Sequence, residues 1–267
     1  MKKILAITTY NRKQTLERMA KSFREANLID CETIIFDDCS TEFNRIYLSR
    51  LFPSARIVVN SENIGSDNNI RSMYKYFLKT DADILYSLDS DLIFHPDFVE
   101  IGLNLLKNTD GIVSLYNSFK HPAYDSLLCC GQKLLLKKHI GSAGTVFTRQ
   151  IMKVIMDNVS LSRSFDWDWS AFLEKINVRI LVSETSYIQH IGFTGYNTKH
   201  TFEMDYGLNF LPVTQINVKI LLELLEISII EGNGALKNKL EELDGIRDTV
   251  SWKITAPLRW LGKKITA

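Results

Sequence analysis

Apolar and polar residues alternate along the first half of the chain in segments that fit strands and helices in turn. Short runs rich in β-branched residues predict buried strands at 3–9, 32–38, 55–60 and 82–91. Between these runs, apolar residues recur at helical spacing and predict helices at 12–26, 42–52 and 66–80. This alternation is typical of α/β proteins with a parallel sheet and helices on both faces.

The second half is less regular. Its pattern predicts helices at 96–108, 149–158 and 167–176, strands at 111–118 and 142–148, and further strand material within 178–192. We expect this half to complete the sheet and to form one wall of a cleft. No element is predicted for 118–144, which we expect to be a long loop.

After Pro212 the pattern changes to an apolar helix at 217–232 and a charged helix at 235–248. We therefore divide the chain into a domain at 1–211 and a helical extension at 212–267. The last segment, 250–267, combines tryptophans with lysines and arginine, which suits a membrane interface. Packing on the domain or a dimer contact explains this segment equally well.

Composition and charge narrow the classes of partner. Apolar residues make up 45% of the chain and charged residues 24%, which is typical of a globular protein. The net charge of +1 does not indicate a nucleic-acid surface. The four cysteines form no C-x-x-C pair, so reduced thiols are expected rather than a zinc site or disulfides.

The amino-terminal sequence favours a buried strand over a targeting segment. The apolar run after Lys2 and Lys3 is only about six residues long, whereas secretory signals carry roughly 7–15. No run reaches the roughly 18 apolar residues of a membrane-spanning helix. We expect a cytoplasmic protein.

Polar side chains recur where the predicted strands end. They are Thr8 and Thr9, Asp37 and Asp38, Asn60, and Asp89 and Asp91. In open α/β sheets, ligands bind outside the carboxyl ends of the strands. We therefore expect these side chains to converge in one crevice.

Asp89 and Asp91 form a D-x-D pattern whose carboxylates point the same way on an extended segment. Two such groups repel each other unless a cation lies between them. Mg²⁺ and Mn²⁺ prefer oxygen ligands and take one or two carboxylates together with substrate phosphates. The pattern thus suits a metal-bound diphosphate, although acidic turns are also common.

Four short motifs occur in an order that resembles a known family. They are "ITTYNR" (7–12), "FDDCST" (36–41), "NIGSDNN" (63–69) and "SLDSD" (87–91). The chain is similar over 3–195 to inverting glycosyltransferases of the GT-A fold, family 2, of the bacterial polysaccharide type. This resemblance implies a Rossmann-like nucleotide-binding half, a mixed central sheet and a C-terminal helical appendage.

The resemblance also implies a donor site. Thr8 would line the nucleotide pocket, and Asp38 would accept a hydrogen bond from N3–H of uracil or thymine, while Asp37 braces the loop. For both acids, a turn or a helix cap is the alternative. Further residues implied on the donor side are Tyr10, Asn63, Gly65, Asn69, Arg71, Asp89 and Ser90.

For the metal, Mn²⁺ or Mg²⁺, the resemblance implies Asp91 as a direct ligand and Asp89 as a contact to ribose or, through water, to the ion. His190, in "YIQHIGFTG" (187–195), would complete the metal site. Imidazole suits Mn²⁺ better than Mg²⁺. A hydrogen-bonded core histidine is the alternative for His190.

On the acceptor side, the family places a Glu-Asp-x-Asp sequence at the start of a helix. This chain has Phe165 where the Glu would be, followed by Asp166, which aligns with the general base, and Asp168, which is second in line. Trp167 and Trp169 could raise the pKa of the base by desolvation and stack on sugar rings. The alternative is helix capping by the acids with both tryptophans in the core.

The implied reaction is metal-assisted direct displacement. A sugar would move from a UDP- or dTDP-sugar to a hydroxyl of a glycan or lipid-linked glycan in cell-envelope polysaccharide synthesis, with peripheral contact to the inner membrane face through 250–267. A homodimer is also compatible with this picture. The loop 118–144 would lie on the acceptor side, where Lys133, Lys137, Lys138 and His139 either meet phosphate or are simply solvated.

Two other functions remain open on the sequence. A metal-dependent nucleotidyltransferase also uses a D-x-D-like site, but "TTYNRKQT" lacks the glycines of a triphosphate-binding loop. An inactive nucleotide-sugar-binding module is the second alternative, and the intact acids argue against it.

Overall fold

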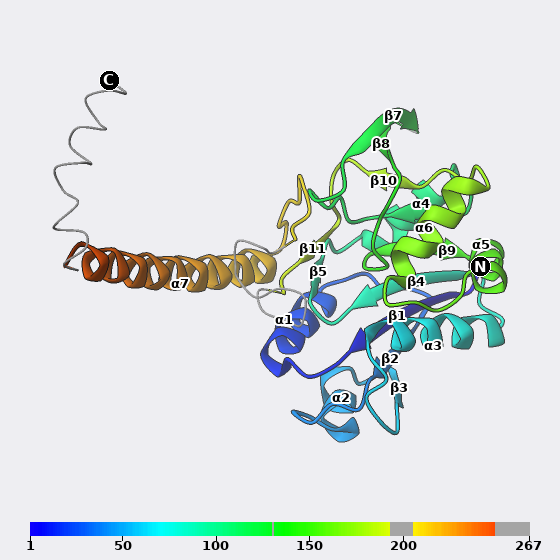
Figure 1. Ribbon diagram of the computed structural model, residues 1–267. Coiled ribbons are helices and arrows are strands. Elements are labelled where there is room, and N and C mark those ends of the chain that lie inside the picture. Colours follow the sequence, from blue (N-terminus) through cyan, green and yellow to red (C-terminus); the bar gives the residue numbers. More distant parts are fainter. Residues whose placement is uncertain (130, 193–204, 249–267) are drawn as a thin grey trace. The chain divides into compact units, whose positions relative to one another are not determined.

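The computed structural model describes residues 1–129, 131–192 and 205–248 (Figure 1). The chain falls into two units, Met1–Ile220 and Leu221–Ala267. The first unit holds all the candidate site residues. The second consists, in its described part, of the continuation of one long helix.

The first unit is built on a mixed sheet that has nine strands in the described part of the chain. Its strands, in spatial order, are β3 (Arg56–Val59), β2 (Cys31–Asp37), β1 (Lys3–Thr9), β4 (Ile84–Asp89), β9 (Thr145–Thr148), β6 (Ile112–Ser114), β10 (Leu181–Ser183), β8 (Gln132–Lys137) and β7 (Ala123–Cys129). The first four run parallel. β9 then runs antiparallel to both of its neighbours, which makes the sheet mixed.

Helices cover both faces of this sheet because successive residues of each strand point to opposite faces. On β1, Leu5 and Ile7 pack with α1 (Lys13–Phe23), α2 (Arg45–Leu51) and α4 (Phe98–Leu106). On the same strand, Ile4 and Ala6 belong to the core beneath α3 (Ser66–Lys79), α5 (Arg149–Asn158) and α6 (Phe165–Lys175). Packing in these two cores fixes the strands, and therefore the positions of their ends relative to one another.

A second, two-stranded sheet lies beside the end of β4. It pairs β5 (Leu92–Phe94) with β11 (Ile188–His190) in antiparallel fashion, with His190 opposite Leu92. Leu92 follows Asp91 directly in the sequence, so this register brings His190 beside the acidic strand end. A one-residue slip would send the imidazole to the opposite face.

The structure confirms the α/β fold with a mixed central sheet and a C-terminal helix, and it corrects three expectations. A parallel arrangement holds for β3, β2, β1 and β4 and for the pair of β6 and β10, whereas the other neighbouring strands of the sheet are antiparallel. The segment 118–144 is a hairpin of β7 and β8 rather than a loop. Most of the β7 residues are exposed, because this strand lies at the edge of the sheet, so it lacks an alternating apolar pattern.

The third correction concerns the two helices expected after Pro212. A single helix, α7, runs from Gln215 to Asp248 through Gly232 and Gly234. A glycine costs a helix only about 1 kcal/mol relative to alanine, so two of them did not have to end it. Within the described residues, no helix combines the length and the apolar composition needed to span a bilayer. The segment 250–267, expected at a membrane, lies outside the described residues.

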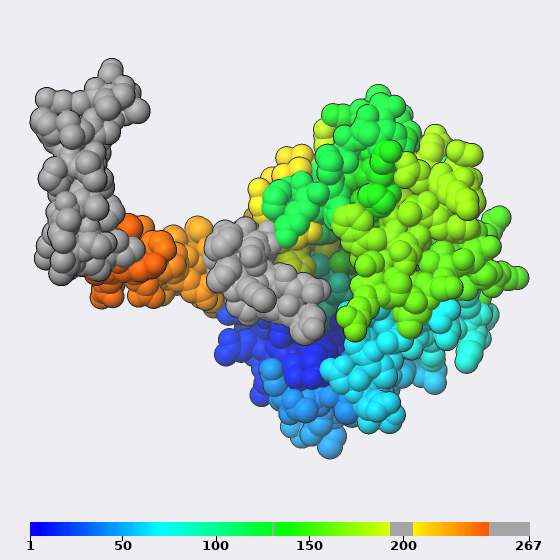
Figure 2. All heavy atoms as spheres, viewed as in Figure 1, coloured from blue at the N-terminus to red at the C-terminus, as the bar shows by residue number. Residues whose placement is uncertain are grey.

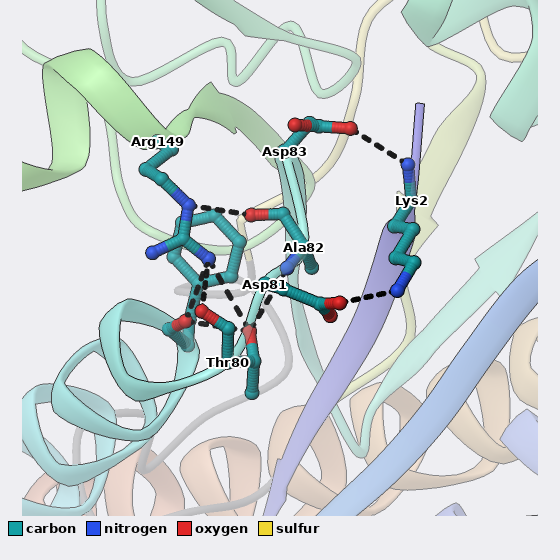
Figure 3. Close-up of polar contacts among 7 residues, drawn as sticks. Lys2, Thr80, Asp81, Ala82, Asp83 and Arg149 are labelled. Atoms are coloured by element: carbon teal, nitrogen blue, oxygen red, sulfur yellow. Dashed lines mark hydrogen bonds and ion pairs between the residues drawn. The ribbon is translucent and has the colours of Figure 1, made fainter.

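Arg149 joins the two halves of the first unit (Figure 3). From the first residue of α5, its guanidinium donates to backbone carbonyls at the end of α3 and before β4, those of Phe77, Leu78, Thr80 and Ala82. The guanidinium also lies 4.9 Å from the centroid of the Phe77 ring. Carbonyls at a helix end lack the donors of a following turn, and the fork of the arginine supplies donors here; the Phe77 carbonyl also accepts from Thr80.

We predict that Arg149→Lys lowers the free energy of unfolding by about 1–3 kcal/mol, because an ammonium group cannot serve all these carbonyls at once. Urea denaturation of both proteins measures the difference. Asp81→Asn is the matched control, since Asp81 pairs with Lys2 at the surface of the same region and should matter little. Equal losses in the two variants would contradict the assigned role of Arg149.

Candidate active site

The D-x-D acids lie at the end of β4 and have different surroundings. Asp89 is the last residue of the strand, and its Oδ1 accepts a hydrogen bond of 2.7 Å from Thr8 Oγ1 at the end of β1. Burial, followed by the negative charge of Asp91, raises the pKa of Asp89 to about 6. Asp89 is thus a carboxyl group that gains from a nearby cation.

Asp91 already has cationic partners. Its side chain is 6% exposed, and its Oδ2 lies 2.7 Å from Arg12 Nη1 and 3.1 Å from His190 Nε2. Burial alone would raise the pKa of Asp91, but His190 and Arg12 outweigh it and hold that pKa below its ordinary range. For His190, burial opposes the charge, yet Asp91 raises its pKa. The three side chains form one ionic cluster.

Gly192 makes the close approach of Asp91 and His190 possible. A Cβ atom at this position would lie 2.6 Å from Asp91 Oδ2 and 2.8 Å from His190 Cε1. The backbone N–H of Ile191 also donates to the carbonyl of Asp91 at 2.8 Å. Only glycine leaves room for the two side chains between these backbones.

Arg12 was not among the predicted site residues, although it ends the "ITTYNR" motif. Arg12 and its neighbour Asn11 both adopt the left-handed backbone region, with φ of 56° and 50°. Asn11 is held by a hydrogen bond from its N–H to Ser40 Oγ, and its side chain accepts from the N–H of Thr41. Consecutive left-handed residues other than glycine are costly and persist only when their surroundings hold them, as they do here.

The side chains of Asp37 and Asp38, at the end of β2, both accept hydrogen bonds from other residues of the chain. Asp37 accepts from Ser40 Oγ and N–H, so it braces its own turn as expected. Asp38, 2% exposed, accepts from Asn60 Nδ2 and from the N–H groups of Ile64 and Gly65, each at 2.9 Å. A carboxylate has about four acceptor positions, so one remains for a ligand. The helix-cap alternative does not hold, because Asn44 caps α2.

The other predicted donor residues lie in the loop that Asp38 holds and in α3, the helix that follows it. Asn63 is exposed, and Gly65 has φ of 84° at the start of α3. Asn69, predicted to face the nucleotide, instead donates from Nδ2 to the Phe36 carbonyl and supports the loop from within. Arg71 is half-buried, with no hydrogen-bond partner for its Nε among the described residues.

Tyr10 and Ser90, two further residues predicted on the donor side, lie directly after β1 and β4. Tyr10 follows β1 and is 42% exposed, so its ring is available to a ligand. Ser90, between the two acids, is buried, and its N–H donates to the Thr8 carbonyl at 3.0 Å. Ser90 therefore fixes the D-x-D turn against β1.

The predicted metal ligands meet only in part. The 3.1 Å between Asp91 Oδ2 and His190 Nε2 suits two neighbouring ligands of one ion. His190 Nδ1 is buried and has no partner among the described residues. However, the described residues contain no group of three or more His, Cys, Asp or Glu side chains suited to a metal. The pair fits an ion that completes its shell with phosphate oxygens and water, as Mg²⁺ commonly does.

The acceptor-side acids lie in the first turn of α6. Asp166 is half-buried, and burial, partly offset by a hydrogen bond from the Trp167 N–H, raises its pKa. Asp168 is exposed and is bound by Ser162 Oγ. Phe165, where the family has a Glu, is 1% exposed and packs against Tyr74, so it anchors the helix. Its N–H donates to Asp67 Oδ1 at the start of α3.

Trp167 and Trp169 lie in different surroundings, one at the surface and one in the core. Trp167 is 50% exposed, and its ring lies 4.9 Å from that of His139 and 5.5 Å from that of His121. Trp169 is fully buried and packs edge-on against Phe147. Trp169 therefore offers no face to an acceptor in this structure, and its core alternative is correct. Nothing in the sequence around the two histidines marked them as neighbours of Trp167.

The lysines of the basic run on and directly after β8 have partners within the protein. Lys133 pairs with Glu184 and Lys138 with Glu174. Lys137 is buried and donates to Asn117 Oδ1 and to the Ser118 carbonyl, and burial lowers its pKa to about 8. Lys137 is therefore neither solvated nor open to a phosphate, whereas Lys133 and Lys138 remain about half exposed, so the two alternatives stay open for them.

Figure 2 shows the hairpin and the α5–α6 region, in green and yellow-green, adjoining the surface of the amino-terminal half, in blue and cyan. A parallel half with acids at its strand ends, joined to a half that carries Asp166, fits the arrangement that the sequence resemblance implies. The comparisons with known proteins agree. Residues 4–126 match the family described as "Glycosyl transferase family 2".

Residues 4–126 are thus similar to glycosyl transferase family 2, and this similarity supports the predicted enzyme class, a glycosyltransferase. A search among curated proteins finds no significant match.

Solved structures of S. aureus TarS show the same fold at low identity. S. aureus TarS 1–349 in complex with UDP-GlcNAc has a TM-score of 0.55 at 13% identity, over 76% of this chain and 61% of that one. TarS 1–349 alone gives 0.53 at 13% identity, over 70% and 60%. The mannosyltransferase PcManGT from Pyrobaculum calidifontis, in complex with GDP-Man and Mn²⁺, gives 0.49 at 13%, over 68% and 56%. This chain thus spans 56–61% of the length of these structures.

We predict that Asp38→Ala costs about 1–3 kcal/mol of unfolding free energy, because the Ile64 N–H loses its acceptor and the Gly65 N–H and the Asn60 amide each lose one of two. Urea denaturation measures this loss. Asn63→Ala, at an exposed position of the same loop, is the control and should cost less. A cost for Asn63→Ala equal to that of Asp38→Ala would argue that Asp38 does not hold the loop.

We predict that Gly192→Ala lowers the pKa of His190 toward its ordinary value, because the added methyl group pushes the imidazole away from Asp91. Titration of the histidine ring signals by NMR measures the pKa. Gly141→Ala is the control, since its Cβ would meet Asp166 at an ordinary 3.7 Å. A His190 pKa that stays raised in Gly192→Ala would show that the glycine is not needed for the pair.

Proposed function

We propose that this enzyme transfers a sugar from a UDP- or dTDP-sugar to a hydroxyl of a glycan or lipid-linked glycan, with inversion at the anomeric carbon. The observation that carries the proposal is the presence of two separate acidic centres. One is the Asp91–His190 pair beside the parallel strand ends, and the other is Asp166 on α6. The first suits a diphosphate leaving group and the second an acceptor hydroxyl.

The donor would bind across the ends of β1, β2 and β4. Asp38 has one acceptor position left, which suits the N3–H of uracil or thymine, and Thr8 and Tyr10 flank the same edge. One of the similar structures, that of TarS, holds UDP-GlcNAc, which supports a uridine donor here. The Asn63–Gly65 loop and Arg71 complete this side, while Asn69 and Ser90 support it from within.

A divalent cation, Mn²⁺ or Mg²⁺, would be held by Asp91 and His190, with Asp89 nearby. When bound, such an ion neutralises the charge that develops on the departing diphosphate. Other residues of the chain position these ligands. Thr8 orients the Asp89 carboxyl, and Gly192 leaves room for the paired Asp91 and His190.

The general base would be Asp166. Its carboxyl has a pKa raised by burial, which makes it a better proton acceptor than an exposed acid once it is ionised. Asp168 is engaged by Ser162 and exposed to solvent, so it is the weaker candidate. The half-exposed ring of Trp167 beside Asp166 suits stacking on an acceptor sugar.

The remaining parts of the proposal concern cellular setting. The enzyme would work in the cytoplasm in cell-envelope polysaccharide synthesis, with 1–211 as the catalytic domain. The extension 212–267 would bring it to the inner membrane face or join two copies.

The proposal predicts that Asp166→Asn lowers kcat by about 10²–10⁴-fold, because the acceptor proton loses its acceptor, while the Kd for UDP stays within about threefold. Turnover of UDP- and dTDP-sugars with Mn²⁺, and calorimetric titration with UDP, measure the two quantities. Asp168→Asn is the matched control and should keep most of the activity.

In the wild type, activity should fall as the pH drops through the raised pKa of Asp166, which lies above that of an ordinary aspartate. Full turnover by Asp166→Asn would remove Asp166 as the base. Absence of UDP and dTDP binding in the presence of Mn²⁺ would overturn the proposed donor.

A further inference from the structure

Arg12 is the cation nearest to the carboxylate that the proposed function gives to a metal. Its Nη1 lies 2.7 Å from Asp91 Oδ2, the same oxygen that His190 approaches. A positive charge at this distance neutralises Asp91 and repels a second cation placed against the carboxylate. The acid therefore has its counter-ion before any metal arrives.

The two partners differ in their freedom to move. The Arg12 side chain is 35% exposed, whereas that of Asp91 is 6% exposed and that of His190 is 20% exposed. Arg12 also extends from a loop held in the left-handed region at two successive residues, and Ser40 and Thr41 fix the position of Asn11 before it. The loop fixes the base of the side chain, and the guanidinium at its end can swing toward solvent.

We propose that Arg12 guards the cation site, which means that its guanidinium pairs with Asp91 while no donor is bound. When the donor and the metal enter together, the guanidinium moves from Asp91 to the donor's diphosphate. The inference rests on the proposed function, because it assumes a diphosphate donor. A diphosphate bound at the ends of β1 and β4 offers the guanidinium an anion of higher charge. Asp91 is then released to the metal, so donor and metal bind with positive coupling.

This coupling distinguishes Arg12 from a residue that merely supports the fold. A supporting residue would weaken metal binding when it is replaced, because the site would become less ordered. A guarding residue must do the reverse in the donor-free protein, since its removal leaves Asp91 without a competing cation. By reciprocity, UDP should tighten Mn²⁺ binding by the same factor by which Mn²⁺ tightens UDP binding.

The test is calorimetric titration of the full chain with Mn²⁺, without and with saturating UDP. We expect UDP to tighten Mn²⁺ binding to the wild type by about 5–150-fold, the usual span of coupling between sites. We expect Arg12→Gln to bind Mn²⁺ at least about tenfold more tightly than the wild type without UDP, and to show reduced coupling. Arg12→Lys, which keeps the charge and the backbone strain, should remain close to the wild type.

Three results would overturn the guarding role: unchanged or weaker Mn²⁺ binding in Arg12→Gln, no coupling between UDP and Mn²⁺ in the wild type, or no Mn²⁺ binding in any of the proteins. If Arg12→Gln folds poorly, Arg12→Met, which also removes the charge, takes its place in the same titrations. Titration with UDP alone separates this inference from the proposed function, because a protein that binds UDP but lacks the coupling refutes only the role of Arg12.

Discussion

The site depends on the cost of burying one charged carboxylate. Asp91 lies at 6% exposure, and a carboxylate in such surroundings remains ionised only when cations compensate for the lost hydration. Arg12 comes from the loop after β1 and His190 from β11, so the compensation draws together three parts of the chain that are far apart in sequence. Gly192 and the register of β5 with β11 follow from the same requirement.

The acids of this site have the same side chain but different pKa shifts and different partners, because their surroundings differ. Asp89 and Asp91 are two residues apart, yet the pKa of one is raised and that of the other is lowered. Only Asp91 has cations within hydrogen-bond distance. Asp38 uses most of its acceptor positions on backbone N–H groups and so acts as a brace as much as a ligand group. Opposed pKa shifts of this kind are typical of catalytic centres.

The sequence was sufficient for the elements whose apolar pattern is strong. The parallel strands and α1, α3 and α5 lie within a few residues of their predicted bounds, because each has a single buried face or a continuous buried run. The edge hairpin escaped prediction because edge strands need no buried face. β5 escaped it because a strand of three residues carries too little pattern, whereas β11 lies within the strand material predicted at 178–192.

Within the site, the chemistry was easier to foresee than the geometry. His190, Asp89 and Asp91 were found from short motifs, but no motif could show that Arg12 turns back through a left-handed backbone to meet Asp91. Trp167 and Trp169 looked equivalent in composition. Their separation follows from helical spacing, since Trp169 lies four residues after the buried Phe165 and shares its face, whereas Trp167 lies two residues after it.

The placement of His190 on the small sheet affects how the enzyme loses activity on heating. β5 and β11 are three residues each and stand outside the nine-stranded sheet of the described chain, so their pairing can open locally without unfolding the rest. Opening of this ladder separates His190 from Asp91 while the main sheet and its helices remain intact. Thermal inactivation would then precede melting, and the amide protons of β11 would exchange with solvent sooner than those of β1 and β4.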